Sequence, residues 1–289
     1  MRMNFDCIPC FQRQALQAVR FIHGNEYLQE RVLREVIKKL LELTWDFKPI
    51  EMAYEVHKVV RKITQVTDPY GEVKKASNDL VLDRYSKLTS MVNESEDPLR
   101  TAVTLAIAGN IIDFGALSEF DLDKTIRNVS KKTFAIDDYR KFKEKLKDAD
   151  TLLFFADNAG EICLDKLLIE SMLKIKSFKR LNFVVKGGPI INDATLEDAL
   201  YVGLDKLPNI NFLTISNGEV DTGPKIRSQD VAGWVKTCDL VISKGQANYE
   251  GLSEFNEIFF ALVVKCFVVA SDLSVNLKDI VFKYNLYRN

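Results

Sequence analysis

The stretch TLLFFADNAGE, Thr151–Glu161, decides the fold of this chain. Its first six residues, Thr151–Ala156, are almost continuously apolar, which is typical of a strand buried on both faces of a sheet. Its last five, Asp157–Glu161, are polar or small and lead into Ile162–Ile175, a stretch that has the length of a helix. Because a buried strand that passes directly into a helix is characteristic of an α/β unit, the sequence predicts a parallel sheet.

Four further apolar runs repeat this pattern through the C-terminal half of the chain. The runs are Leu181–Lys186, Asn211–Ser216, Cys238–Lys244 and Leu262–Ala270. Helix-like stretches such as Leu196–Tyr201 lie between them. Runs that are apolar on both faces and alternate with helices indicate a mostly parallel sheet covered by helices on both sides. We therefore predict an α/β domain over residues 149–289.

The first 148 residues instead carry apolar side chains at three-and-four spacing, which is typical of amphipathic helices. The expected helices are Leu28–Leu41, Pro49–Ile63, a long one from after Asp68-Pro69 to about Val92, one that begins at Asp97-Pro98, and Ile136–Leu146. No repeat, low-complexity tract or flexible linker interrupts the chain. We therefore predict an all-α subdomain over residues 1–148 that packs with the α/β domain as one body.

The composition restricts the class of protein. Hydrophobic residues make up 47% of the 289 residues, enough for a sizeable core. Lys plus Arg number 40 against 41 Asp plus Glu, and this balance argues against binding to a nucleic acid polymer. No apolar run reaches the roughly 18–20 residues of a membrane span. The N-terminus, MRMNFDCIPCFQRQ, turns polar too soon for a secretory signal, so we expect a cytoplasmic protein.

The cysteines and histidines limit the possible metal sites. Five cysteines, mostly in apolar runs, fit a reducing compartment better than a disulfide framework. Only two histidines are present, which excludes a site built from three imidazoles. Cys7 and Cys10 form a single C-x-x-C motif. This pair is consistent with a redox-active dithiol, with half a metal site, or with two thiols packed at a helix start.

Polar residues follow each of the first four predicted strands. These segments are Asp157–Glu161, Lys186–Asp193, Ser216–Glu219 and Lys244–Asn248. The carboxyl ends of parallel strands lie at one edge of the sheet, where ligands bind. Although one such segment could be an ordinary turn or helix cap, four in succession indicate a site.

The residue types at this edge indicate phosphate chemistry. Asp157, Asn158 and Asp193 offer oxygen ligands, which suit Mg²⁺ or Mn²⁺ better than a closed Zn²⁺ site. Lys186 and Lys244 each end a strand, where an amine can meet an anionic group. The glycines beside them allow the backbone to approach a ligand closely.

The sequence lacks the motifs of several other enzyme classes. The chain has no G-x-G-x-x-G after its first strand, no G-x-x-x-x-G-K-[ST] and no G-x-S-x-G. A haloacid-dehalogenase-like phosphatase needs a second Asp two positions after the strand-end Asp157, and that position is Ala159. Direct attack by water is therefore favoured over a covalent aspartyl-phosphate.

Taken together, the motifs resemble the metal-dependent damage-control phosphatase family, long catalogued as a domain of unknown function. The N-terminal CIPC is the mark of a subfamily found largely in archaea. The other matching segments are DPY at Asp68–Tyr70 with Lys74 and Asn78, GNIIDFG at Gly109–Gly115, DNAGE at Asp157–Glu161, KGGPIINDAT at Lys186–Thr195, SNGEVDTG at Ser216–Gly223, SKGQANYEGL at Ser243–Leu252 and VKCFVVA at Val264–Ala270.

The resemblance carries expectations about fold, metal and substrate. It implies a helical portion beside a Rossmann-like three-layer α/β/α domain. It implies one divalent ion, commonly Mn²⁺, Ni²⁺, Co²⁺ or Mg²⁺, held by Asp157, Asn158 and Asp193. The substrates implied are phosphate esters of sugars or nucleotides, with damaged purine nucleotides or their precursors suggested for this subfamily. The residues expected to line the substrate pocket are Glu161, Asn192, Gln246, Asn248 and Lys265, with Asn110 and Asp113 from the helical side.

The resulting hypothesis is a metal-dependent phosphomonoesterase. Lys186 and Lys244 would stabilise the charge of the phosphoryl group, and Glu161 or Asp113 would orient the attacking water or protonate the leaving oxygen. One alternative is a carboxyl methyltransferase that uses S-adenosylmethionine, an activity attributed to a branch of the same family. Since it needs no metal, it leaves Asp157 and its two partners without a role. Another alternative is a non-enzymatic redox or metal-binding module centred on the C-x-x-C motif.

Overall fold

The computed structural model describes residues 3–42, 44–111, 133–216 and 224–286. Within these residues, one seven-stranded sheet has the order β1-β7-β6-β5-β2-β3-β4. The strands are β1 Ile136–Asp137, β2 Thr151–Phe155, β3 Arg180–Lys186, β4 Ile210–Ile215, β5 Leu240–Lys244, β6 Ile258–Val263 and β7 Ile280–Asn285. All neighbouring strands are parallel except β6 and β7, which are antiparallel. The prediction of an α/β fold with a mostly parallel sheet is confirmed.

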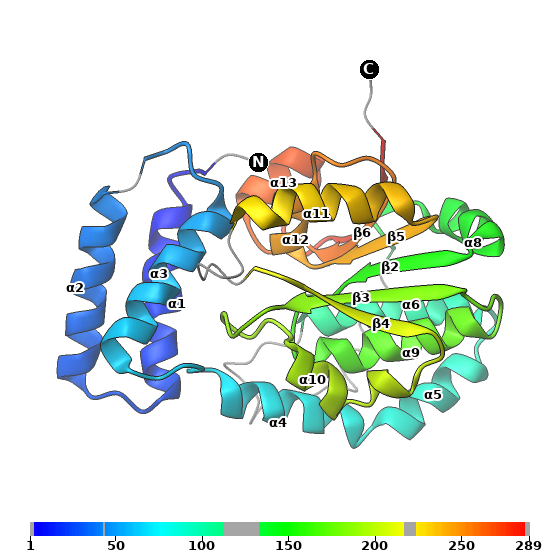
Figure 1. Cartoon of the computed structure of the whole chain (residues 1–289), viewed down its shortest axis with the longest axis horizontal. Helices are drawn as coiled ribbons and strands as arrows, with labels where there is room; N and C mark the ends of the chain where they lie inside the picture. The colour runs from blue at the N-terminus through cyan, green and yellow to red at the C-terminus, as the bar shows by residue number, and fades with distance from the viewer. Residues whose placement is uncertain (1–2, 43, 112–132, 217–223, 287–289) are drawn as a thin grey trace.

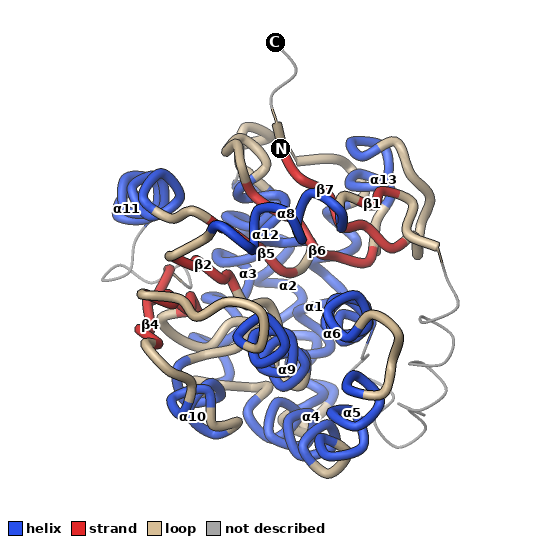
Figure 2. Tube along the Cα trace, turned by 90° about the vertical axis from the view of Figure 1, so that its right-hand side faces the viewer, coloured by secondary structure: helices blue, strands red, loops and turns tan. Residues whose placement is uncertain are grey.

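Helices cover both faces of the sheet and form the outer two of three layers (Figures 1 and 2). On one face lie α6 (Pro98–Ala108) and α9 (Glu161–Leu173). On the other face lie α11 (Pro224–Thr237), α12 (Gln246–Leu252) and α13 (Phe267–Leu273). Each face has its own buried apolar cluster, because successive side chains of a strand point to opposite faces. The sheet is therefore buried on both sides, as its apolar runs predict.

The remaining helices complete the two faces and form a separate bundle at one end of the molecule. They are α1 Cys7–Phe21, α2 Glu26–Glu42, α3 Pro49–Thr64, α4 Gly71–Leu82, α5 Tyr85–Asn93, α8 Tyr139–Asp148 and α10 Leu196–Tyr201, with the 3₁₀ turns η1 Gly109–Ile111 and η3 Leu204–Lys206. Among the described residues, no helix is long and apolar enough to cross a membrane.

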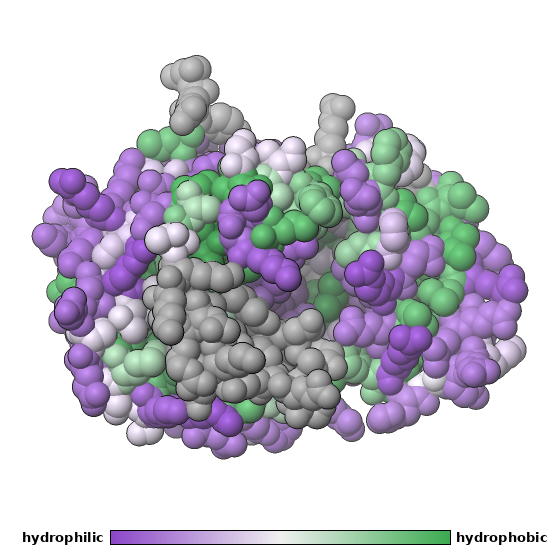
Figure 3. Space-filling view, turned by 180° about the vertical axis from the view of Figure 1, so that it is seen from behind, coloured by the Kyte–Doolittle hydropathy of each residue, from purple (hydrophilic) through white to green (hydrophobic). Residues whose placement is uncertain are grey.

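The first three helices share a small core of their own. Buried side chains of α1, α2 and α3 pack together, among them Phe11, Val36 and Met52. Their outer surface mixes hydrophilic and hydrophobic residues (Figure 3), among them the exposed Leu41 of α2. By contrast, Leu88 and Leu99, from α5 and α6, belong to the same cluster as the α9 face of the sheet. The domain boundary near residue 148 stays a prediction.

The bundle meets the sheet at the carboxyl ends of the strands. The hydroxyl of Tyr54 on α3 donates to the backbone oxygen of Ser216, directly after β4, at 3.1 Å. The guanidinium of Arg61, also on α3, donates to the carbonyl of Pro189 at 3.2 Å. The third helix therefore forms a wall beside the edge where the sequence places the site.

Three expectations about individual elements are wrong. The run Leu262–Ala270 is not one strand, since β6 ends at Val263 and α13 begins at Phe267. The helix expected to reach Val92 is two helices, because Arg84, at φ −108° and ψ 1°, leaves the helical range of backbone angles. The helix expected to begin at Ile136 begins at Tyr139, and the two residues before Asp138 form β1.

Candidate active site at the carboxyl edge of the sheet

Backbone hydrogen bonds hold together the loops that follow β2 and β3. The amide of Ala194 donates to the carbonyl of Asp157 at 2.8 Å, and the amide of Ala159 donates to the carbonyl of Asn192 at 2.9 Å. A bridge of β type joins Asn158 to Asp193. These contacts bring together the three residues predicted to hold a metal ion, although they lie on two separate loops.

Asp157, Asn158 and Asp193 line one wall of a cavity of about 300 Å³. All three side chains are buried, with exposures between 7% and 9%. The amine of Lys186 lies 3.4 Å from Oδ2 of Asp193. The arrangement places two carboxylates and one amide on the wall of this cavity, with one ammonium group beside Asp193.

Three close neighbours fix the position of the Asp157 carboxylate. Its Oδ2 accepts hydrogen bonds from the amides of Asn110, at 2.7 Å, and Asn158, at 2.6 Å. Gly245, at φ +81°, lies directly against it, and a Cβ at this position would come within 1.9 Å of Oδ2. Only glycine combines this backbone angle with so close an approach.

Burial and the negative charge of neighbouring carboxylates both raise the pKa of the carboxyl groups at this site. Burial, followed by the charges of Glu161 and Asp193, raises the pKa of Asp157 well above its usual value. Burial also raises the pKa of Asp193, against the opposing charge of Lys186. Negative charge concentrated in a buried pocket favours binding of a cation.

The donor set fits a hard divalent cation at an open site. Two carboxylates and an amide oxygen are ligands that Mg²⁺ and Mn²⁺ accept, and water or substrate completes such a shell. Within the described ranges, no three His, Cys, Asp or Glu side chains gather as a metal-binding group. A closed site of the zinc type is therefore not formed by these residues.

Lys244 lies behind this wall, in the core of the α9 face. It is completely buried, and its amine donates to the carboxylates of Glu161 at 2.6 Å and Asp165 at 2.7 Å, and to the carbonyl of Ala106 at 2.8 Å. Burial alone would lower the pKa of Lys244, but the charges of Asp165 and Glu161 outweigh this effect and raise it. Because three acceptors already occupy the three N–H groups, the expectation that Lys244 meets a phosphate does not fit its position.

Glu161 connects this buried lysine to the metal-binding residues. Its Oε1 accepts from Lys244, and its Oε2 accepts from the amides of Asn110 at 3.0 Å and Asn158 at 3.2 Å. Glu161 is itself fully buried. Asn110 thus donates both to it and to Asp157, which brings the predicted helical-side residue to the site. Asp113 lies outside the described residues.

The other expected pocket residues lie on the same side of the sheet. Asn192, Gln246 and Lys265 line the cavity that contains the metal-binding residues. Gln246 accepts from the amide of Lys265 at 3.0 Å, so these two residues form one rim. Asn248 is buried and lines a neighbouring cavity, where its amide donates to the carbonyls of Ala156 and Lys244.

The C-x-x-C motif begins α1 and lines the same 300 Å³ cavity. Burial raises the pKa of both Cys7 and Cys10, which disfavours their thiolate forms. Cys266, which is partly exposed, lines this cavity as well. The motif is therefore adjacent to the metal-binding residues, and the choice between its redox and packing roles stays open.

Sequence reasoning did not find Asp165, and it named Asn78 only as part of a family motif, without its role. Asp165 follows Glu161 by one helical turn, and this i, i+4 spacing could have signalled a shared partner. Burial, opposed by the charge of Lys244, raises its pKa to about 7. Asn78 on α4 accepts from the amide of Gly160 at 2.6 Å, which holds the turn at φ +77° before α9. No local pattern indicates this contact, because the two residues lie 82 positions apart.

A family model described as the damage-control phosphatase ARMT1-like domain matches residues 3–281. This chain belongs to that damage-control phosphatase family. Membership of the family confirms the resemblance inferred from the motifs and indicates a phosphatase. The assignment to a subfamily marked by C-x-x-C stays a prediction.

Relatives of the family align along almost the whole chain. An uncharacterized protein of Methanocaldococcus jannaschii is 33% identical over 290 residues, covering 96% of this chain and 94% of that protein. A damage-control phosphatase of Archaeoglobus fulgidus is 32% identical, with coverage of 98% and 99%. A damage-control phosphatase of Pyrococcus horikoshii is 31% identical, with coverage of 100% for both. The crystal structure of a DUF89 family protein from Pyrococcus horikoshii has a TM-score of 0.85 at 30% identity, covering 99% of this chain and all of that one.

Proposed function

We propose that this member of the damage-control phosphatase family is a metal-dependent hydrolase of phosphomonoesters. The observation that supports the proposal is the group formed by Asp157, Asn158 and Asp193, with the amine of Lys186 at 3.4 Å from Asp193. A bound cation and a neighbouring ammonium group would both be able to stabilise the negative charge of one phosphate.

Asp157, Asn158 and Asp193 would hold the divalent ion, for which Mn²⁺, Ni²⁺, Mg²⁺ and Co²⁺ are the candidates. Such an ion, when bound, supplies Lewis-acid polarisation of a phosphoryl oxygen. Gly245 and Asn110 keep the carboxylate of Asp157 in place before a ligand arrives. Preorganisation of this kind lowers the cost of binding, because no side chain has to be reoriented.

Lys186 is the residue that we assign to the phosphoryl group. Only 3% of Lys186 is exposed. It lines the smaller cavity next to the metal-binding residues, with its amine 3.4 Å from Asp193. An ammonium group in a buried pocket interacts with an anion more strongly than one in water. Lys186 therefore stabilises the charge that the phosphoryl group carries during transfer.

Glu161 and Lys244 act as positioning residues in this proposal. Both oxygens of Glu161 are engaged, by Lys244 on one side and by two amides on the other. Glu161 therefore orients the amides of Asn110 and Asn158 instead of activating water. A role for Asp113 as the group that orients water or protonates the leaving oxygen remains a prediction from the family resemblance.

The substrate in this proposal is a small metabolite. A cavity of about 300 Å³ has room for a sugar phosphate or part of a nucleotide. Relatives carry the name damage-control phosphatase, which supports a role in removing damaged or unwanted phosphate esters. Damaged purine nucleotides or their precursors are one such class.

The test is release of phosphate from an aryl phosphate with and without Mn²⁺. The Asp157→Ala variant removes one of two carboxylate ligands, and we expect at least a ~1,000-fold loss of metal-stimulated turnover, about 4 kcal/mol of barrier. Asp205→Ala, a change at an exposed Asp of η3, serves as the matched control and should keep the wild-type rate. Unchanged activity in Asp157→Ala would refute the site.

A thermal-shift measurement separates the proposal from its methyltransferase alternative. A ligand that binds only the folded protein raises its melting temperature. We expect Mn²⁺ to raise it and S-adenosylmethionine to leave it unchanged. The opposite result would support the alternative.

A further inference from the structure

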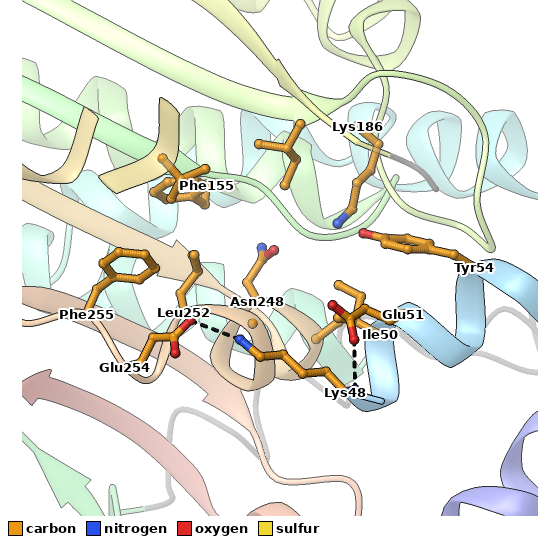
Figure 4. A pocket seen from close by; sticks show the side chains of 14 residues that line it. Lys48, Ile50, Glu51, Tyr54, Phe155, Lys186, Asn248, Leu252, Glu254 and Phe255 are labelled. Carbon is orange, nitrogen blue, oxygen red and sulfur yellow. Dashed lines mark hydrogen bonds and ion pairs between the residues drawn. The ribbon is translucent and has the colours of Figure 1, made fainter. Parts of the chain in front are cut away.

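A second, smaller cavity adjoins the one that contains the metal-binding residues. It has a volume of about 110 Å³ and lies between α3, α12 and the ends of the strands (Figure 4). Ile50, Tyr54 and Ala247 line both cavities, so the two share a wall. We call it the side pocket.

The side pocket has one polar end and one apolar end. Figure 4 shows the amine of Lys186 and the hydroxyl of Tyr54 at one end. Phe155, Leu252 and Phe255 gather at the other end, away from these two atoms, and the ion pair of Lys48 and Glu254 lies beside Leu252 and Phe255. A ligand that fits this distribution has a polar or charged group joined directly to an apolar one.

Lys186 sets the orientation of such a ligand. Its amine lines the side pocket and also lies 3.4 Å from Asp193, which lines the larger cavity. A phosphate held between this amine and the metal-binding residues therefore sits where the two cavities meet. The group esterified to it can extend toward the apolar end of the side pocket.

An ion pair borders the side pocket on its outer side. Lys48, just before α3, donates to Glu254, just after α12, at 2.9 Å. The backbone amide of Lys48 also donates to Glu51 at 2.9 Å, which fixes the start of α3. These contacts join the two helices that form the pocket walls, so the pocket is formed before a ligand binds.

The volume restricts the size of the apolar group. An apolar cavity of about 150 Å³ in another protein holds benzene. The side pocket, at about 110 Å³, is smaller than that cavity and is not closed, so it takes at most one six-membered ring and is too small for two fused rings. We propose that the side pocket is the subsite for a single planar, apolar ring in the alcohol part of a phosphate ester, an inference that rests on the proposed phosphatase function.

Two inert phosphonates test this subsite without any turnover. Phenylphosphonate and methylphosphonate carry the same anionic group and differ in the ring, and neither has an ester bond to hydrolyse. Calorimetric titration of both, in the presence of Mn²⁺, gives the ratio of their dissociation constants. Because burial of a ring of this size is worth roughly a factor of 10 or more, we expect phenylphosphonate to bind at least ~10-fold more tightly.

Gly251 offers a way to fill the side pocket. It lies in α12 on the pocket wall, and a Cβ built there meets no atom within 4 Å. The Cβ of Gly251→Leu therefore has open space beside the pocket wall, and the rest of the leucine side chain is expected to occupy part of the ring subsite. Gly233→Leu is the matched control, because Gly233 also lies in a helix with nothing within 4 Å and lines neither cavity. Leucine favours the helix over glycine at both positions, so both variants should fold.

The expected result is a ratio of at least ~10 in the wild type and in Gly233→Leu that falls to about 1–2 in Gly251→Leu. A ratio that is unchanged by Gly251→Leu overturns the inference. A wild-type ratio near 1 also overturns it. Failure of both phosphonates to bind overturns it as well. Loss of the phosphatase proposal would show instead as absence of phosphate release from every ester, with the ratio of phosphonate affinities unaffected.

Discussion

The ends of strands β3 and β5 look alike in sequence and differ completely in the structure. Each ends in a lysine followed by glycine, Lys186-Gly187 and Lys244-Gly245. Lys186 lines the side pocket and lies 3.4 Å from Asp193, whereas Lys244 is enclosed among acceptors in the core of the α9 face. One lysine is placed to bind an anion, and the other supports the residues that bind the cation.

The register of the sheet explains this difference. Phe155 on β2 pairs with Val184 on β3 and with Ser243 on β5, so these three residues share a face. Lys186 follows Val184 by two positions and returns to that face, while Lys244 follows Ser243 by one and points to the opposite face. A shift of a single residue at a strand end therefore decides whether a lysine becomes part of the site or part of the core.

Removal of Lys244 should have the largest effect on stability. Lys244→Met leaves the buried carboxylates of Glu161 and Asp165 without their cation. Loss of one partner of a buried ion pair costs about 3–5 kcal/mol of unfolding free energy, measurable by urea denaturation. Lys38→Met, which removes an exposed i, i+3 pair with Glu35, is the control and should change stability by less than about 1 kcal/mol. A similarly small loss in Lys244→Met would contradict the comparison.

The Lys186→Met variant should lose mainly activity, whereas Lys244→Met should lose mainly stability. We expect a fall of about 100-fold in phosphate release, equivalent to about 2.7 kcal/mol of barrier, because the charge beside the phosphoryl group is lost. The loss of unfolding free energy should be smaller than in Lys244→Met, since only one carboxylate, that of Asp193, loses a partner among the pairs described. Steady-state kinetics and urea denaturation on the same samples check both parts. Full activity in this variant would contradict our assignment of Lys186.

Ser243 gives the smallest expected effect and the opposite sign. It precedes Lys244 on the other face of β5, and its buried hydroxyl has no hydrogen-bond partner among the described residues. A buried hydroxyl without a partner is unfavourable, so Ser243→Ala should leave stability unchanged or raise it by up to about 1 kcal/mol. Urea denaturation measures this change. A loss above about 1 kcal/mol would mean that the hydroxyl has an unrecognised role.

The buried strands of the fold could be predicted, because a continuous apolar run in the sequence indicates a buried segment. β2, β3, β4 and β5 were found within one or two residues because each is short, apolar and flanked by polar residues. Residues 262–270 were misassigned for the same reason. The end of β6 and the short helix α13 are both buried on the sheet, and apolar content alone does not separate them. The antiparallel strand β7 was missed altogether.

The site could be predicted only as a set of residues near one edge. Strand-end position was enough to bring Asp157 and Asp193 together, because parallel strands present their carboxyl ends at the same edge. It could not tell Lys186 from Lys244, because that distinction depends on register between strands far apart in the chain. Nor could it predict the contact of Asn78 with Gly160, which joins helices α4 and α9 across 82 residues.

The central claim is that Asp157, Asn158 and Asp193 hold one divalent cation. The most direct test is a crystal soaked in Mn²⁺ and measured near the manganese absorption edge. Our account predicts one anomalous peak about 2.0–2.3 Å from an oxygen of each of these three side chains, the range expected for hard cations. A peak that contacts none of them, or a site held instead by Cys7 and Cys10, would contradict it.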